Sequence, residues 1–174
     1  MGLDRRISKV AAHRASVRKV AVAYARRAEG ESLSDMERVQ AQEFEATIEA
    51  MFLMAAVDGQ VAGDEKAQLA ASLQAILDTR GRRETVDIDR TLQDLSGKLE
   101  REGWIARLDT VAKRLTTEEA RSFAFRLAAA VAFVDDHVAH AEAAAIDALS
   151  HALKLTNEAS QQILQEVQEM LFQE

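Results

Sequence analysis

Acidic side chains and two histidines gather at two places in the chain, and both places have the composition of turns between helices. Carboxylate oxygens are the ligands that Ca²⁺ and Mg²⁺ prefer, whereas imidazoles favour Zn²⁺ and other transition metals. If the fold brings the two turns together, one divalent cation can bind between them, with Ca²⁺ or Mg²⁺ favoured over Zn²⁺. The candidate ligands are Asp58, Asp64 and Glu65 in the first turn and Asp135, Asp136, His137, His140 and Glu142 in the second.

The same acidic residues also have a purely structural interpretation. A Glu at the third position of a helix caps free backbone N–H groups and suits the positive end of the helix dipole, and an Asp in a turn can bond to its own backbone. Capping alone would explain why Glu65 and Glu142 recur. An EF-hand is excluded, because Ala62 and Leu69 stand where that loop needs side-chain ligands.

The two turns belong to an internal repeat. Residues 50–69 align with residues 127–146, so that Asp58 falls on Asp135 and Glu65 on Glu142. In both copies an apolar run of small residues ends at an Asp, a short turn follows, and a new helix begins. Two helix-turn-helix units of this kind can bury their apolar faces against each other by pseudo-twofold packing.

The strings AAVDGQVAGDEKAQL and AFVDDHVAHAEAAAI carry this repeat. They resemble an intact and a degenerate copy of the TerB-like motif, roughly A-x-x-D-G-x-[VI]-x-x-x-E-x-x-x-[LI]. The resemblance implies a duplicated, all-helical, non-catalytic protein tied to tellurite resistance, stress response and divalent-cation binding. The chain departs from the pattern in two respects. Ala62 and Ala139 stand where many members have Ser or Asp, and Asp136 and His137 replace the Gly and its neighbour in the second copy.

Helices must position these turns, because the chain has no Pro and is dominated by Ala and straight-chain helix formers. Apolar residues recur at helical spacing, glycines interrupt the pattern, and two capping boxes start at Ser34 and Thr116. We therefore predict an all-α fold of about eight helices in one bundle, without strands. Its two pseudo-symmetric halves would span about 30–103 and 104–174 of a TerB-like domain, residues 30–174.

Residues 1–29 are predicted to form a basic amphipathic N-terminal helix, continuous over residues 3–28. Residues 1–28 carry eight Arg or Lys against one Asp, although the whole chain has a net charge of -7. Such a helix can dock on an anionic membrane surface or an acidic protein. Alternatively, its apolar side packs on the rest of the fold and its basic side offsets the acidic body. The docking candidates are Arg5, Arg6, Lys9, Arg14, Arg18 and Lys19.

Several classes of protein are excluded by what the sequence lacks. The absence of Cys fits a reducing cytoplasm, and the longest charge-free stretch, the eleven residues 67–77, is too short to span a bilayer. No nucleophile elbow, phosphate-binding loop or dinucleotide fingerprint occurs, so no enzymatic activity is expected. The net negative charge outside residues 1–28 argues against binding to nucleic acid.

We expect a cytoplasmic accessory protein, at most peripheral to the inner membrane, with an unknown protein partner or a second copy as a homo-dimer. The alternative is a helical interaction or membrane-docking module that binds no metal.

Overall fold

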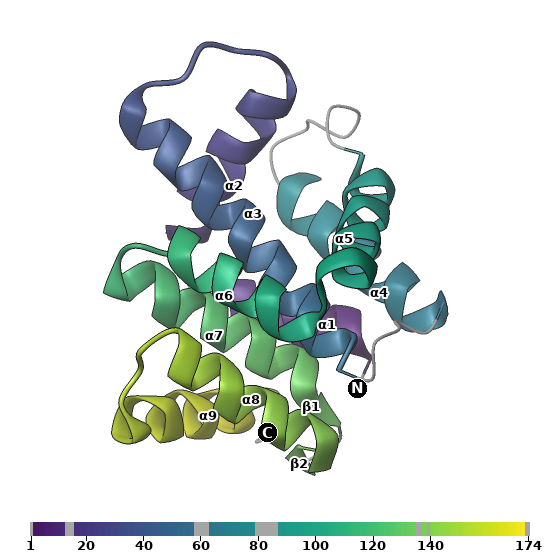
Figure 1. Ribbon diagram of the computed structural model, residues 1–174, viewed down its shortest axis with the longest axis vertical. Helices are drawn as coiled ribbons and strands as arrows, with labels where there is room; N and C mark the ends of the chain where they lie inside the picture. Colours follow the sequence, from purple (N-terminus) through teal and green to yellow (C-terminus); the bar gives the residue numbers. More distant parts are fainter. Residues whose placement is uncertain are drawn as a thin grey trace.

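The structure is a computed structural model that describes residues 2–12, 16–57, 63–78, 87–134, 137–138 and 140–172. These residues form nine helices and one pair of two-residue strands (Figure 1), which confirms the all-α class. The helices are α1 (Leu3–Ala12), α2 (Ser16–Ala28), α3 (Asp35–Ala55), α4 (Gly63–Asp78), α5 (Ile88–Glu102), α6 (Trp104–Arg114), α7 (Glu118–Ala132), α8 (His140–Ala152) and α9 (Asn157–Phe172). The strands are β1 (Phe133–Val134) and β2 (His137–Val138).

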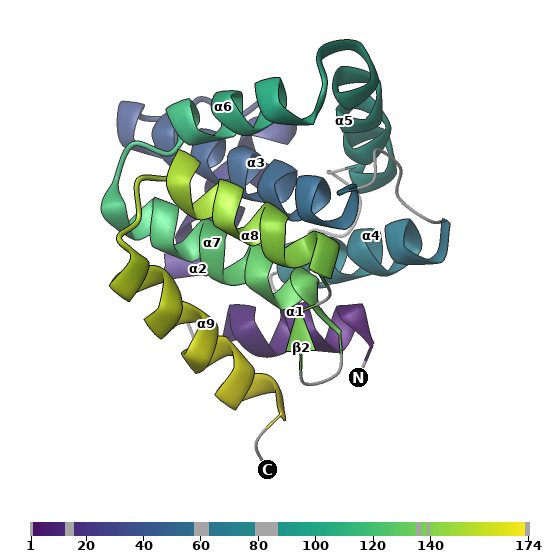
Figure 2. The ribbon, with the colours of Figure 1, turned by 60° about the horizontal axis from the view of Figure 1, so that its bottom comes forward.

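Helices α3 and α7 pack against each other at the centre of the fold. They contain most of the two apolar runs of the repeat, and their large side chains Phe44, Ile48, Phe52, Phe125 and Leu127 are fully buried. Both views show the two helices running in the same direction (Figures 1 and 2). Helix α2 packs on α3, while α1, α8 and α9 pack on α7. The apolar runs therefore form the core, as their composition predicts.

Local signals fix where the central helices begin. At Ser34 the predicted capping box is present: the Ser34 hydroxyl accepts from the Glu37 N–H, and the Glu37 carboxylate accepts from the Ser34 N–H, both at 3.2 Å. The second cap lies one residue later than predicted. Thr117, with an extended backbone, accepts from the Ala120 N–H at 3.1 Å, so Thr117 and not Thr116 caps α7.

Within residues 3–28, which were predicted to form one helix, the structure describes two helices, α1 and α2. Residues 13–15 between them lie outside the described part of the chain. The apolar faces of α1 and α2 are buried in different places. Ile7 and Val10 pack where α1 meets α4 and α7, whereas Ala21 and Tyr24 are buried on α2, which packs chiefly on α3. This division also brings the number of described helices to nine instead of eight.

A short hairpin occupies the second turn of the repeat, where no strand was expected. Phe133 pairs with Val138 and Val134 with His137 in an antiparallel arrangement. Strands this short show no alternation of apolar and polar residues, which explains why they could not be predicted from the pattern of residues. Asp135 and Asp136, which lie between the two strands in the sequence, are outside the described residues.

The helices that follow the two motif copies have different neighbours. Helix α4 packs mainly on α1, whereas α8 packs on α7 and α6. In one respect the copies agree, because Glu65 and Glu142 are each the third residue of their helix, as predicted. The pseudo-symmetry of the two halves stays a prediction. Among the helices that the structure describes, none combines the length and apolar character that a bilayer-spanning segment needs.

Candidate functional site

The predicted metal ligands fall largely outside the described side chains. Asp58, Asp135 and Asp136 are not among the described residues, and the side chains of Asp64, His137 and His140 are not described although their backbones lie in α4, β2 and α8. Glu65 is exposed on α4, and Glu142 is half-buried on α8. Within the described part of the chain, no three His, Asp or Glu side chains gather as ligands for a metal ion. The metal site therefore stays a prediction.

The predicted basic docking face is corrected at Arg6. Its side chain is buried, and its guanidinium donates from Nε to the Ala130 carbonyl at 2.9 Å and from Nη2 to the Val131 carbonyl at 3.4 Å. Arg6 therefore joins α1 to the last turn of α7 and is not available to a membrane or partner.

The other docking candidates do not all lie on one helix or in one environment. Arg5 is exposed and Lys9 half-buried on α1, and Lys19 is exposed on α2. Arg14 lies outside the described residues, as does the side chain of Arg18. The apolar side of α1 is used in the core, since Ile7 and Val10 are fully buried. Helix α1 thus has no free apolar face at these positions with which to enter a membrane.

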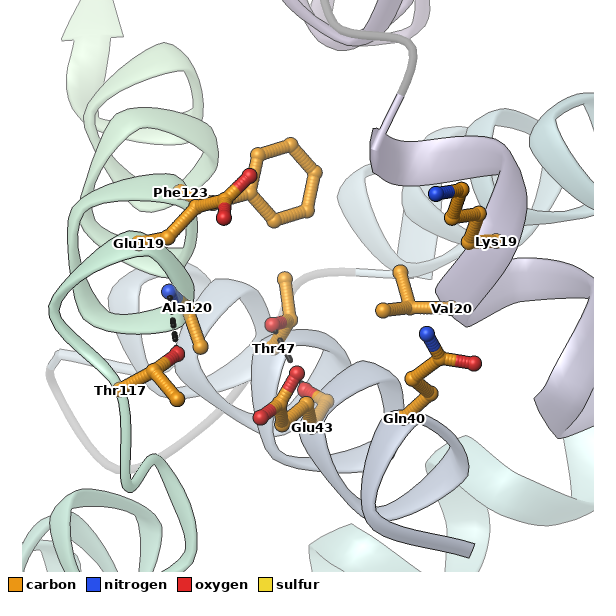
Figure 3. Close-up of a pocket in the computed structure, with 9 residues that line it drawn as sticks. All are labelled: Lys19, Val20, Gln40, Glu43, Thr47, Thr117, Glu119, Ala120 and Phe123. Atoms are coloured by element: carbon orange, nitrogen blue, oxygen red, sulfur yellow. Dashed lines mark hydrogen bonds between the residues drawn. The ribbon is translucent and has the colours of Figure 1, made fainter. Parts of the chain in front are cut away.

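A cleft that the sequence did not predict opens between α2, α3 and the start of α7 (Figure 3). Its volume is about 310 Å³. Carboxylate, amide, hydroxyl and ammonium groups share its walls with apolar side chains. The lining residues are Lys19 and Val20 from α2, Gln40, Glu43 and Thr47 from α3, and Thr117, Glu119, Ala120 and Phe123 from the α7 end. Because these residues come from three separate parts of the chain, no local motif could have revealed them.

Helical spacing places these groups on the cleft. Gln40, Glu43 and Thr47 are three and four residues apart and so share one side of α3. The Thr47 hydroxyl donates to the Glu43 backbone carbonyl of its own helix at 2.8 Å. This hydrogen bond therefore does not involve the Glu43 carboxylate. On the opposite wall, the Thr117 cap starts α7, and Glu119 and Phe123 follow one helical turn apart (Figure 3).

Of the two carboxylates of the cleft, Glu43 is half-buried and lies in an unfavourable electrostatic environment, whereas Glu119 is exposed. Burial raises the pKa of Glu43, and the negative charge of Glu119 raises it further. No described residue forms an ion pair with Glu43 or Glu119, whereas Glu45, two positions away, pairs with Arg27 and Arg114. The hydrogen bond from Arg27 and the charge of Arg114 outweigh the effect of burial and lower the pKa of Glu45. The cleft therefore holds two acidic groups that have no arginine partner among the described residues.

Replacing Glu43 with Gln is expected to raise the melting temperature near neutral pH. The pKa of Glu43 in the folded chain lies above its ordinary value of 4.5, so the protonated form favours folding. This contribution is fully present below that ordinary value and is lost as the pH rises through the raised pKa, so ionised Glu43 destabilises the native chain at neutral pH. The measurement compares the melting temperatures of the wild type and E43Q at about pH 7 and about pH 4. A gain at the higher pH that shrinks at the lower one is expected, and a loss at neutral pH would contradict it.

A second groove adjoins the cleft between α7 and α9. It shares Glu119 and Phe123 with the cleft, so these two residues stand between the two hollows. This groove contains a positively charged side chain, since Arg126 forms an ion pair with Glu166 at 2.6 Å. The groove therefore differs from the cleft in that an arginine of the described chain pairs with one of its carboxylates.

Comparison with known proteins adds no relative from which a ligand could be transferred. No family model matches this chain. No curated protein and no solved structure matches it either. The resemblance to the TerB-like family therefore rests on the two motif copies and on the helices that contain them.

Proposed function

We propose that this chain is a non-catalytic, TerB-like accessory protein of tellurite resistance and stress response. Its direct biochemical act is to bind a divalent cation, Ca²⁺ or Mg²⁺ in preference to Zn²⁺, with ligands from the two acidic turns. Binding would fix how α4 and α8 pack beside the central pair and so control the surface that the protein presents to a partner.

The observation that carries this proposal is the arrangement of the two motif copies. The helices that lead into the two turns, α3 and α7, are packed together and run in the same direction (Figure 2). Both turns therefore follow helix ends on one side of the molecule. Each turn is also followed by a helix whose third residue is a Glu, Glu65 in α4 and Glu142 in α8. The proposal places carboxylates from both turns on this side, where a shared oxygen-ligand site would need them.

Adding the correct ion to chelator-stripped protein is expected to raise the melting temperature. A ligand that binds only the native state stabilises it by about 2.7 kcal/mol at a hundredfold excess over its Kd, which for a domain of this size is roughly 5 °C or more. The measurement is thermal unfolding with Ca²⁺, Mg²⁺, Mn²⁺ and Zn²⁺ added in turn.

The double variant E65Q/E142Q distinguishes whether Glu65 and Glu142 act as metal ligands or as helix caps. Gln can keep the hydrogen bond of a capping box but supplies no anionic oxygen to a hard cation. Cation binding at the turns predicts that the variant keeps its metal-free melting temperature and loses the ion-dependent rise. If no ion shifts the wild type, the acidic residues serve as helix caps and the chain is a metal-free interaction module instead.

A further inference from the structure

The cleft between α2, α3 and α7 has the features of a small-molecule site that is separate from the acidic turns. We propose that it binds a small aliphatic monoamine, with the ammonium group held by Glu43 and Glu119 and the hydrocarbon part lying on Phe123 and Val20. Amine binding here does not depend on cation binding at the turns, since the two sites share no residue.

The shape and lining of the cleft fit a small amphipathic ligand. Ligand sites are typically concave, partly apolar and equipped with a few converging polar groups, and a volume of about 310 Å³ suits only a small molecule. Figure 3 shows Glu119 and Phe123 on one wall and Glu43 on the neighbouring one, with Val20 across from them. Polar and apolar contacts are therefore available to opposite ends of one short molecule.

Charge determines which end of the ligand the carboxylates bind. Three half-buried or buried carboxylates of the described chain pair with arginine: Glu45 pairs with Arg27 and Arg114, Glu49 with Arg107, and Glu166 with Arg126. Glu43 and Glu119 come from different helices, line the same cleft and have no such partner among the described residues. An ammonium group bound between them would relieve their repulsion and supply hydrogen-bond donors to both.

Other ligand classes fit less well. An anion would be repelled by the two carboxylates, and a hard divalent cation needs six or more oxygen ligands, whereas no third carboxylate of the described chain joins this pair. An ammonium group is also attracted to the face of an aromatic ring such as that of Phe123. Lys19 stands across the cleft from Glu119 (Figure 3), so a second positive charge on the ligand would meet a like charge. For this reason a monoamine is favoured over a diamine.

The test is a titration of the full chain with n-butylamine, followed by the backbone amide signals of α3 and α7 in NMR spectra. A molecule of this size is expected to bind with a Kd of about 1 mM. n-Butanol and butyrate have the same chain length without the positive charge, and 1,4-diaminobutane has a second one. Saturable shifts with n-butylamine, and weaker or absent ones with the other three compounds, would support the proposal. Absence of saturable binding of n-butylamine, or equal binding of n-butanol, would overturn it.

Variants locate the binding and control for general charge effects. E43Q/E119Q is expected to weaken n-butylamine binding about tenfold or more, because charged hydrogen bonds are lost. E118Q removes the same charge from the adjacent residue of α7, which is exposed and lines the α7–α9 groove instead of the cleft, so it should leave binding unchanged. Equal loss in both variants would show a non-specific charge effect and reject the site. Retained amine binding in E65Q/E142Q would separate this site from the proposed cation site.

Discussion

Replacing Arg107 with Met is expected to lower the free energy of unfolding by about 3–5 kcal/mol. Arg107 on α6 is buried and forms a bidentate ion pair with Glu49 on α3, with Nε to Oε1 at 2.6 Å and Nη2 to Oε2 at 2.9 Å. Glu49 is only 1% exposed. The hydrogen bonds to Glu49 and its negative charge raise the pKa of Arg107 further, so Arg107 stays charged. Met fills a similar space but leaves the Glu49 carboxylate buried without this partner.

The loss in R107M should come mainly from the stranded carboxylate and not from packing. The double variant E49M/R107M removes both charges at once and is therefore expected to recover most of the stability, because buried ion pairs often contribute little relative to apolar residues of the same size. Urea unfolding of the wild type, both single variants and the double variant gives the coupling between the two positions. Losses that simply add, with no recovery in the double variant, would contradict this account.

Replacing Arg6 with Ala is expected to lower the free energy of unfolding by about 2–3 kcal/mol and to loosen α1. The last carbonyls of a helix have no partner within the helix, and in α7 the Ala130 and Val131 carbonyls accept from the Arg6 guanidinium. The positive charge also lies at the negative end of the α7 dipole. Without Arg6 these buried carbonyls lose a donor that water cannot easily replace.

Two controls define the role of Arg6. R5A changes the neighbouring Arg, which is exposed, and is expected to have little effect on stability. R6K keeps the charge but cannot present the same planar donors to both carbonyls, so an intermediate loss is expected. Urea unfolding measures the stability, and hydrogen exchange of the α1 amides measures the loosening. Equal effects of R5A and R6A would show that Arg6 has no special role.

The helices and several of their ends could be predicted from the sequence because their causes are local. The absence of Pro and the spacing of apolar residues indicated helices throughout, and the Ser34 capping box set the start of α3. Gly103, with a φ of 88°, separates α5 from α6 as expected, because a glycine adopts that backbone conformation without strain. Likewise, the registers of α4 and α8 place Glu65 and Glu142 as the motif predicted.

The partners of individual side chains could not be predicted, because they depend on helices that are distant in sequence. The helical pattern marked Arg6 as part of a basic face, yet its position next to the end of α7 made it a buried donor. The pattern gave no reason to pair Glu49 with Arg107, or to expect that Glu43 and Glu119 line one cleft and have no arginine partner in the part of the chain that the structure describes. Periodicity tells which face of a helix is apolar. Only the packing of the helices determines which charges meet, because a charge's energy depends on its burial and on the groups around it.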